Sequence, residues 1–212
     1  MRLLVATRNP GKARELRDLL SHLPFEVVFP SERFLEPLPE EAELEGGTSF
    51  AENAVAKARY FAMRGNLPTL AEDSGLEVDA LDGAPGVVSA RWAQREGRWR
   101  GGPGAGPLDA ANNALLVERL AGVPEERRTA RYRAVVAYLE APHARPELVE
   151  ATCEGRILTA PRGTGGFGYD PLFFSPELGM SFAEAPLPAK QRVSHRGRAV
   201  RALVEVLLRR PG

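Results

Sequence analysis

The sequence predicts an α/β fold with a mixed, elongated and twisted β-sheet flanked by helices. Two observations support this prediction. Short apolar runs alternate with helical patterns in the first half, and two long alternating runs follow each other in the second half. The first pattern favours strands joined by helices, and the second favours an antiparallel hairpin. We expect one domain over residues 1–212, organised as two lobes with a cleft for the functional site between them.

The first half contains clear start and stop signals for its elements. Asn9 is a good N-cap before Pro10, and Ser49 with Glu52 forms a capping-box pattern. The expected elements are a strand at 3–6, a helix from Pro10 with leucines at 16, 19, 20 and 23, a strand at 25–29, a helix from Ser49 ended by Gly65, a strand at 69–72 that stops at Asp73-Ser74-Gly75, and a further segment at 76–81.

The second half is expected to hold the hairpin and the closing helix. The expected elements are a helix at 108–121, hairpin strands at 129–140 and 147–159, a glycine-rich loop at 162–171, a strand at 172–174 and a helix at 196–209. We expect the hairpin to build the second lobe. The stretch at 98–107 is rich in glycine and is expected to be a mobile loop between the two halves.

The composition is that of an ordinary globular protein with no bulk charge. Hydrophobic residues make up 43% and charged residues 26%, and the formal net charge is zero. A neutral chain gives no electrostatic support for binding nucleic acid or a membrane surface. Cys153 is the single cysteine, and no apolar run reaches membrane-spanning length. We therefore expect a soluble, cytoplasmic protein.

Lysine is rare in this chain. The 28 basic residues include only Lys12, Lys57 and Lys190 as lysines, and all the others are arginines. A lysine supplies a compact point charge on a flexible stem, which arginine does not. The three lysines therefore indicate positions where such a charge is needed.

The segment "ATRNPGK" (6–12) joins the first strand to the first helix. Lys12 falls in the first helical turn, where a cation opposes the helix dipole unless an anion is bound there. Backbone N–H groups, Gly11 and Lys12 together are typical of a phosphate-binding turn. The alternative is a plain strand–turn–helix with a solvated lysine.

The segment "LAEDSGLEVDAL" (70–81) places Asp73 where the first strand of this region is expected to end. Ligands bind at such strand ends in α/β proteins. Mg²⁺ takes one or two carboxylates, waters and substrate phosphates. Glu72 precedes Asp73, and the acidic segment at 40–45 could supply further oxygens. The alternative is a turn aspartate that caps its own backbone.

The segment "GTSFAENAVAKAR" (47–59) places Asn53 and Lys57 four residues apart, on one face of a helix. Taken alone, this spacing favours a solvent-exposed pair. No chemistry is predicted from this segment by spacing alone.

The segment "GTGGFGYDPLF" (163–173) surrounds Phe167 and Tyr169 with glycines. Glycines let the backbone approach a flat ligand, a base can stack on an aromatic ring, and Asp170 can accept hydrogen bonds. The alternative is a tight hairpin with two aromatic side chains at its rim.

The segment "KQRVSHRGRA" (190–199) clusters Lys190, His195 and Arg196 before the last helix, with Ser194 as N-cap. A basic cluster in a lysine-poor chain indicates a binding role. The alternative is a basic helix entry with a solvent-facing histidine.

These segments, together with "EDSGLEVDALDGAPGVVSARWA", resemble the signature segments of the inosine/xanthosine triphosphate pyrophosphatase family, in the same order and from residue 3 to about 205. The resemblance implies Mg²⁺-dependent hydrolysis of deaminated purine nucleoside triphosphates (ITP, dITP and XTP) to monophosphate and pyrophosphate. It implies that Asp73 is the catalytic proton acceptor and a metal ligand. Glu45 is the best match for the second metal carboxylate, with Glu43 and Glu41 as alternatives.

The resemblance also implies a set of substrate-binding residues and a homodimer. The triphosphate would be bound by the loop and by two lysines, and the base by two later segments. These residues are Thr7, Arg8, Asn9, Pro10, Gly11, Lys12, Lys57 and Ser74, followed by Phe167, Gly168, Tyr169, Asp170, Lys190, His195 and Arg196. The dimer contact would involve residues 83–93.

Three other functions remain open at this stage. They are a pyrophosphatase of other modified or standard nucleotides, a nucleotide sensor without turnover, and an RNA-binding module. The base-reading segments oppose the first, and Asp73 opposes the second, because a sensor needs no group that activates water. The neutral charge opposes the third.

Overall fold

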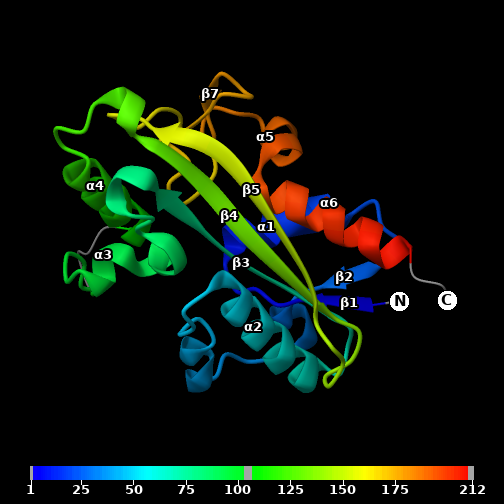
Figure 1. Ribbon diagram of the computed structural model, residues 1–212. Coiled ribbons are helices and arrows are strands. Elements are labelled where there is room, and N and C mark those ends of the chain that lie inside the picture. The colour runs from blue at the N-terminus through cyan, green and yellow to red at the C-terminus, as the bar shows by residue number, and fades with distance from the viewer. Residues whose placement is uncertain (1, 103–106, 210–212) are drawn as a thin grey trace. The chain divides into compact units, whose positions relative to one another are not determined.

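The computed structural model of the protein describes residues 2–102 and 107–209. Seven strands form one sheet in the order β2-β1-β3-β4-β5-β6-β7 (Figure 1). β1 pairs in parallel with β2 and β3, whereas β6 pairs antiparallel with β5 and β7. The predicted α/β class with a mixed sheet is therefore confirmed.

The secondary structure agrees with most of the predicted elements. The strands are β1 (Arg2–Val5), β2 (Glu26–Val28), β3 (Thr69–Val78), β4 (Thr129–Leu139), β5 (Glu147–Ile157), β6 (Phe173–Ser175) and β7 (Met180–Ser181). The α-helices are α1 (Pro10–Leu20), α2 (Phe50–Gly65), α3 (Trp92–Arg95), α4 (Leu108–Arg119), α5 (Leu187–Val193) and α6 (His195–Leu208). Short 3₁₀ helices are η1 (Pro30–Arg33), η2 (Pro39–Glu43), η3 (Asp79–Leu81), η4 (Gly86–Arg91) and η5 (Glu125–Arg127).

The chain forms two compact units. Unit 1 contains the described residues up to Asp73, Ala134–Ala151 and those from His195 onwards, and unit 2 contains Ser74–Arg133 and Thr152–Ser194. The prediction that the hairpin builds a second lobe is wrong, because β4 and β5 each belong partly to both units. The loop expected between two halves lies inside unit 2 as far as it is described, and its residues 103–106 lie outside the described residues.

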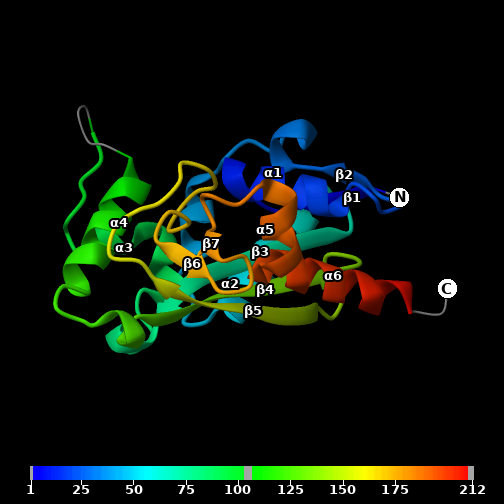
Figure 2. The same cartoon turned by 90° about the horizontal axis from the view of Figure 1, so that it is seen from above.

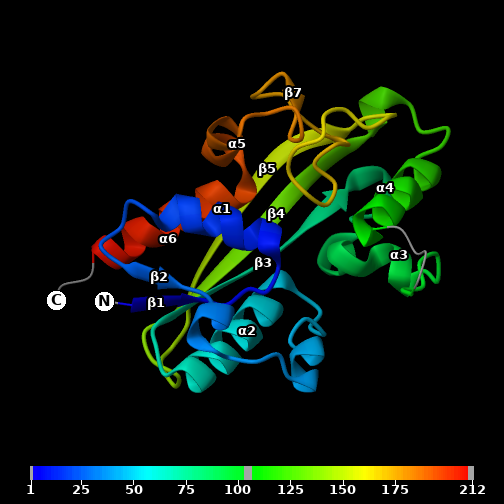
Figure 3. The ribbon, with the colours of Figure 1, turned by 180° about the vertical axis from the view of Figure 1, so that it is seen from behind.

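In unit 1, helices cover both faces of the parallel strands. Figures 1 and 3 show α1 and α6 side by side on one face of β1, and α2 on the opposite face. Asn9 caps α1 as predicted, since its side chain accepts a hydrogen bond from the Lys12 N–H. Leu16, Leu20 and Leu203 are fully buried in the core of this unit.

One predicted boundary is wrong. β3 does not stop at Asp73 but continues through Ser74 and Gly75 to Val78, so Asp73 is a strand residue and caps no turn. The predicted end of α2 at Gly65 is confirmed, and Asn66 is the left-handed cap at φ 46°. Gly65 is also needed for packing, because a Cβ atom there would lie 2.7 Å from Leu4 Cδ2.

In unit 2, an aromatic cluster forms the core. The rings of Tyr132, Phe173 and Phe182 lie 4.7–5.9 Å apart, centroid to centroid, beside the ring of Tyr169. Figure 2 shows α3 and α4 side by side in this unit. Within the described ranges, no helix is long and apolar enough to cross a membrane.

The packing of α6 gives a stability prediction with an internal control. Leu203→Ala removes a fully buried side chain and should lower the free energy of unfolding by about 2–5 kcal/mol. Leu208→Ala, on the same helix but 67% exposed, should change it by less than about 0.5 kcal/mol. Urea unfolding measures both, and equal effects would contradict the observed docking of α6.

Candidate active site

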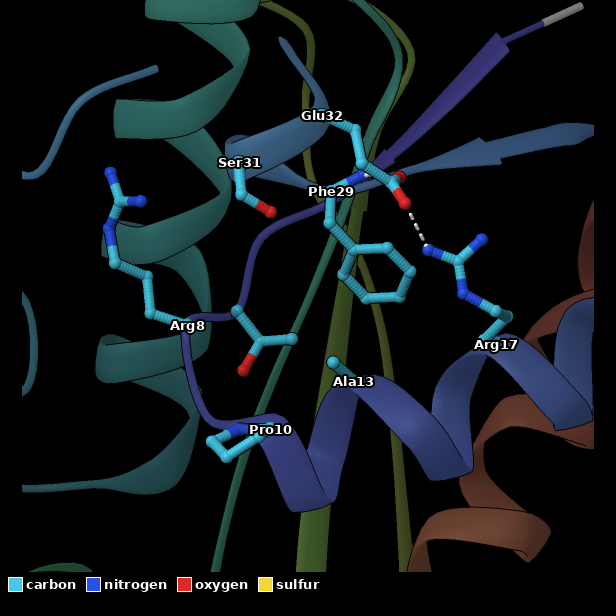
Figure 4. Close-up of a pocket in the computed structure, with 8 residues that line it drawn as sticks. Arg8, Pro10, Ala13, Arg17, Phe29, Ser31 and Glu32 are labelled. Atoms are coloured by element: carbon cyan, nitrogen blue, oxygen red, sulfur yellow. Dashed lines mark hydrogen bonds and ion pairs between the residues drawn. The ribbon is translucent and has the colours of Figure 1, made fainter. Parts of the chain in front are cut away.

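The turn between β1 and α1 is built as predicted, and it faces a pocket. The Thr7 hydroxyl oxygen accepts a hydrogen bond from the Asn9 N–H at 3.2 Å, and Asn9 caps the helix. Thr7, Arg8 and Pro10 line a pocket of about 400 Å³ together with Ala13, Arg17, Phe29, Ser31 and Glu32 (Figure 4). The Arg17 guanidinium lies over the Phe29 ring and pairs with Glu32. Neither Asp73 nor Lys57 lines this pocket.

Lys12 has an anionic partner within the protein. Its Nζ lies 2.9 Å from Glu72 Oε2, and the Glu72 side chain is fully buried. Glu72 also pairs with Arg196 at 3.2 Å, and Arg196 pairs with Glu15 at 2.5 Å. Lys12, Glu72, Arg196 and Glu15 form what we call the α1–α6 ion chain. Glu72 thus supplies the anion that stabilises a lysine in the first turn of a helix.

Lys57 lies between the two carboxylates that are the first candidates for a metal site. Its Nζ donates to Asp73 Oδ1 at 2.7 Å, to Glu45 Oε1 at 2.9 Å and to the Glu72 carbonyl at 3.0 Å. Burial opposes the charged form of Lys57, but Asp73 and Glu45 outweigh it and raise the pKa of the ammonium. We call Lys57, Asp73 and Glu45 the carboxylate cluster.

Asn53 holds the second oxygen of Asp73. Its side-chain amide donates to Asp73 Oδ2 at 3.0 Å, and its own oxygen accepts from the Gly47 N–H at 2.8 Å. A Cβ atom at Gly47 would lie 2.6 Å from that oxygen, so glycine is required for this approach. Asn53 and Lys57 are both buried, and the prediction of a solvent-exposed pair is therefore wrong.

The alternative metal ligands lie in different surroundings. Glu41 binds Arg8 through two hydrogen bonds of 2.5 and 2.7 Å and also pairs with Arg64 at 3.0 Å. The Arg8 hydrogen bond lowers the pKa of Glu41 and favours its charged form, and that charge is paired with arginines and not with a lysine. Glu43 is exposed at the end of η2. Of the three glutamates, Glu45 is the one that shares an ammonium with Asp73.

In unit 2, Lys190 and Asp170 form a buried ion pair. Lys190 Nζ lies 2.5 Å from Asp170 Oδ2, and both side chains are less than 5% exposed. The ammonium also lies over the rings of Phe167 and Phe182, at 5.3 and 5.4 Å from their centroids. Asp170 in addition accepts from the Phe167 N–H at 2.9 Å. The glycine-rich loop and α5 thus bring a carboxylate, a cation and an aromatic ring together within one small region.

The same loop is fixed by its glycines and by α4. Gly166 has φ +70°, and a Cβ atom there would lie 2.0 Å from an Asp170 oxygen. The Gly168 N–H donates to Asp109, and the Gly168 carbonyl accepts from Asn113, each at 2.8 Å. These contacts hold the Phe167 backbone in place beside Asp170.

Three predicted residues are more deeply buried than their motifs indicate. Tyr169 is not a rim aromatic: its ring lies in the core, its hydroxyl donates to the Ser89 carbonyl at 2.9 Å, and burial raises its pKa. His195 and Arg196 are the first residues of α6 and are 3% and 2% exposed, so the solvent-facing alternative is wrong. Ser74 is half-buried in β3.

This geometry can be compared with known proteins. The Ham1 family model matches residues 3–206. The chain belongs to the Ham1 family. It is 48% identical over 207 residues to a dITP/XTP pyrophosphatase of Geobacter sulfurreducens, covering 97% of this chain and 96% of the relative. It is 46% identical to the Desulforamulus reducens dITP/XTP pyrophosphatase, with 99% and 96% covered. A solved HAM1 protein from Coxiella burnetii superposes with a TM-score of 0.81 at 34% identity, covering 99% and 100% of the two chains.

Sequence reasoning missed two structural features of this Ham1 chain. Glu72 was noted only as a neighbour of Asp73, and its partner Arg196 lies 124 residues away. Glu15 was not singled out at all. An available signal was the charge pattern itself, because a glutamate after the buried strand residues Leu70 and Ala71 needs a cation.

The α1–α6 ion chain predicts a large stability effect. Glu72→Gln leaves the buried charges of Lys12 and Arg196 undercompensated and should lower the free energy of unfolding by about 3–5 kcal/mol. The control is Glu205→Gln, which breaks an exposed pair with Arg209 and should change it by about 0.5 kcal/mol or less. Urea unfolding at pH 7 measures both variants. Similar losses of unfolding free energy would show that the burial of Glu72 does not determine the cost of removing its charge.

Proposed function

We propose that this protein hydrolyses deaminated purine nucleoside triphosphates, namely ITP, dITP and XTP, to the monophosphate and pyrophosphate. The observation that carries the proposal is the convergence of Asp73 and Glu45 on one ammonium, in a chain whose full-length relatives are named dITP/XTP pyrophosphatases. We propose a cytoplasmic homodimer as its working form, on the family resemblance alone.

Asp73 and Glu45 suit a hard divalent cation such as Mg²⁺. Mg²⁺ takes one or two carboxylates and completes its shell with waters and substrate phosphates. Among the residues that the structure describes, no group of three or more His, Cys, Asp or Glu side chains could hold a metal. When bound, the cation would neutralise phosphate charge and acidify a water.

The residues of unit 1 supply binding and proton transfer. In this proposal Asp73 orients the attacking water and accepts its proton, and the hydrogen bond from the Asn53 amide supports the role by fixing the carboxylate. Attack at the α-phosphate breaks its bond to the bridging oxygen, which leaves with pyrophosphate. Lys12, in the first turn of the helix that Asn9 caps, and Lys57, beside Asp73, are the proposed cations for the triphosphate.

In this proposal, base recognition falls mainly to Phe167, Asp170 and Lys190 of unit 2. Hypoxanthine and xanthine present an N1–H donor and a 6-oxo acceptor, and adenine presents the reverse. Asp170 can accept from N1–H, Lys190 can donate to the 6-oxo group, and Phe167 offers a ring for stacking. His195 is included as a further base contact on the family resemblance. Arg196 fits a positioning role better, because Glu15 and Glu72 engage its guanidinium.

Pyrophosphate release tests the substrate class. With Mg²⁺, release from ITP, dITP and XTP should exceed release from ATP and GTP by at least about 10²-fold, and a chelator should abolish it. Asp73→Asn, which keeps the shape of the side chain, should lower kcat by at least about 10²-fold with the fold intact by circular dichroism. Equal release from all five nucleotides would indicate a general pyrophosphatase, and ITP binding without release would indicate a sensor.

Lys190 tests base recognition separately. Lys190→Gln keeps a hydrogen-bond donor but removes the charge beside Asp170, so it should lower the ITP-to-ATP ratio of kcat/KM by about 10- to 100-fold. Steady-state kinetics with both nucleotides measure the ratio. An unchanged ratio in the folded variant would show that the base is recognised elsewhere.

A further inference from the structure

The Lys57 ammonium uses its three donors on three oxygens. These are Asp73 Oδ1, Glu45 Oε1 and the Glu72 carbonyl, at 2.7–3.0 Å. Two carboxylates and a backbone carbonyl are also the ligand types that a hard cation takes. The ammonium therefore occupies the point at which these oxygens converge.

The Lys57 ammonium is not the sole support of the carboxylate cluster. The Asp73 side chain does not depend on Lys57 for its position, since Asn53 fixes its other oxygen. The Lys57 side chain is 9% exposed, and its ammonium lies at the end of a flexible four-carbon stem.

We propose that Lys57 is a positioning residue with two alternative locations. In the cation-free protein it lies between Asp73 and Glu45 and keeps these like charges together. When a divalent cation is bound, Lys57 leaves this point and becomes available to the phosphates. This inference rests on the proposed metal site, and it adds that Lys57 competes with the cation.

The competition predicts tighter metal binding without Lys57. An internal competitor lowers the affinity, because the apparent Kd equals the intrinsic Kd divided by the fraction of molecules in which the site is open. Lys57→Gln should therefore bind Mn²⁺ alone at least about tenfold more tightly than the wild type, as measured by electron paramagnetic resonance in nucleotide-free buffer. Lys12→Gln is the matched control, because it removes a neighbouring charge that pairs with Glu72 and not with the carboxylate cluster. The Mn²⁺ affinity of Lys12→Gln should differ from that of the wild type by less than about threefold.

Two outcomes of the Mn²⁺ titrations would overturn the inference. Equal or weaker binding in Lys57→Gln would show that Lys57 does not compete. Equal tightening in Lys57→Gln and Lys12→Gln would show that only the general charge matters.

A second measurement uses the wild-type protein, so that it does not depend on a variant folding. The chain has only three lysines, and its ¹⁵N ammonium spectrum should show one signal for each of Lys12, Lys57 and Lys190. Addition of Mg²⁺ alone should shift or broaden the Lys57 signal and leave the Lys190 signal unchanged. A Lys57 signal that does not respond while Mg²⁺ binds would overturn the inference.

The two proposals fail in distinguishable ways. Mn²⁺ binding that is equally weak in the wild type and in Asp73→Asn would remove the metal site and the inference together. Mg²⁺-dependent release of pyrophosphate with an unresponsive Lys57 signal would leave the proposed function standing and overturn only the role of Lys57.

Discussion

The pleat of β3 is the constraint on which the candidate site of unit 1 depends. Successive side chains of a strand point to opposite faces of the sheet. Glu72 and Asp73 are consecutive in β3, and their partners lie on the two helical layers. Glu72 binds Lys12 of α1 and Arg196 of α6, whereas Asp73 binds Lys57 of α2. Figure 3 shows these layers on opposite sides of the parallel strands.

This division explains why β3 must continue through Asp73. A turn at this residue would end the alternation and would free both carboxylates from their faces. As a strand, β3 delivers two buried carboxylates from two adjacent positions, each to a separate set of cations. Buried charges are tolerated only when they are paired and hydrogen-bonded, so the two faces require basic residues at fixed positions. The ion pairs to α1, α2 and α6 therefore couple the site to the packing of unit 1.

The two charged groups differ in their surroundings. In the α1–α6 ion chain, the side chains of Arg196, Glu15 and Glu72 are no more than 2% exposed. A buried network of this kind rigidifies its surroundings. In the carboxylate cluster, the Glu45 side chain is 34% exposed, so solvent reaches that end of the cluster. The proposed metal chemistry belongs to this second group.

Local patterns predicted the fold well where the signal is local. The Asn9 cap, the helix that follows Ser49 and the long runs of β4 and β5 all lie where short-range rules place them. The short helix α5 was missed, because seven residues carry too little periodicity. The end of β3 was misjudged because Asp-Ser-Gly favours a turn locally, and tertiary pairing overrides that preference.

The site was predictable in its residue types but not in its partners. The three lysines and Asp73 could be singled out from the sequence. The ion pairs join residues up to 181 positions apart, and such pairs are set by the topology of the sheet and not by spacing. The same limit applies to Tyr169, whose motif indicates an exposed ring but whose hydroxyl reaches the Ser89 carbonyl 80 residues away.

The scarcity of lysine acquires a physical meaning from these contacts. Lys12, Lys57 and Lys190 each pair with a carboxylate whose side chain is no more than 6% exposed. Arginine would bind such a carboxylate with a planar, bidentate fork, as Arg8 binds Glu41. An ammonium makes single hydrogen bonds in any direction and can exchange one oxygen for another. Under the proposed function, the three lysine pairs are the ones that exchange a carboxylate oxygen for an oxygen of the substrate, a change that a bidentate arginine pair resists.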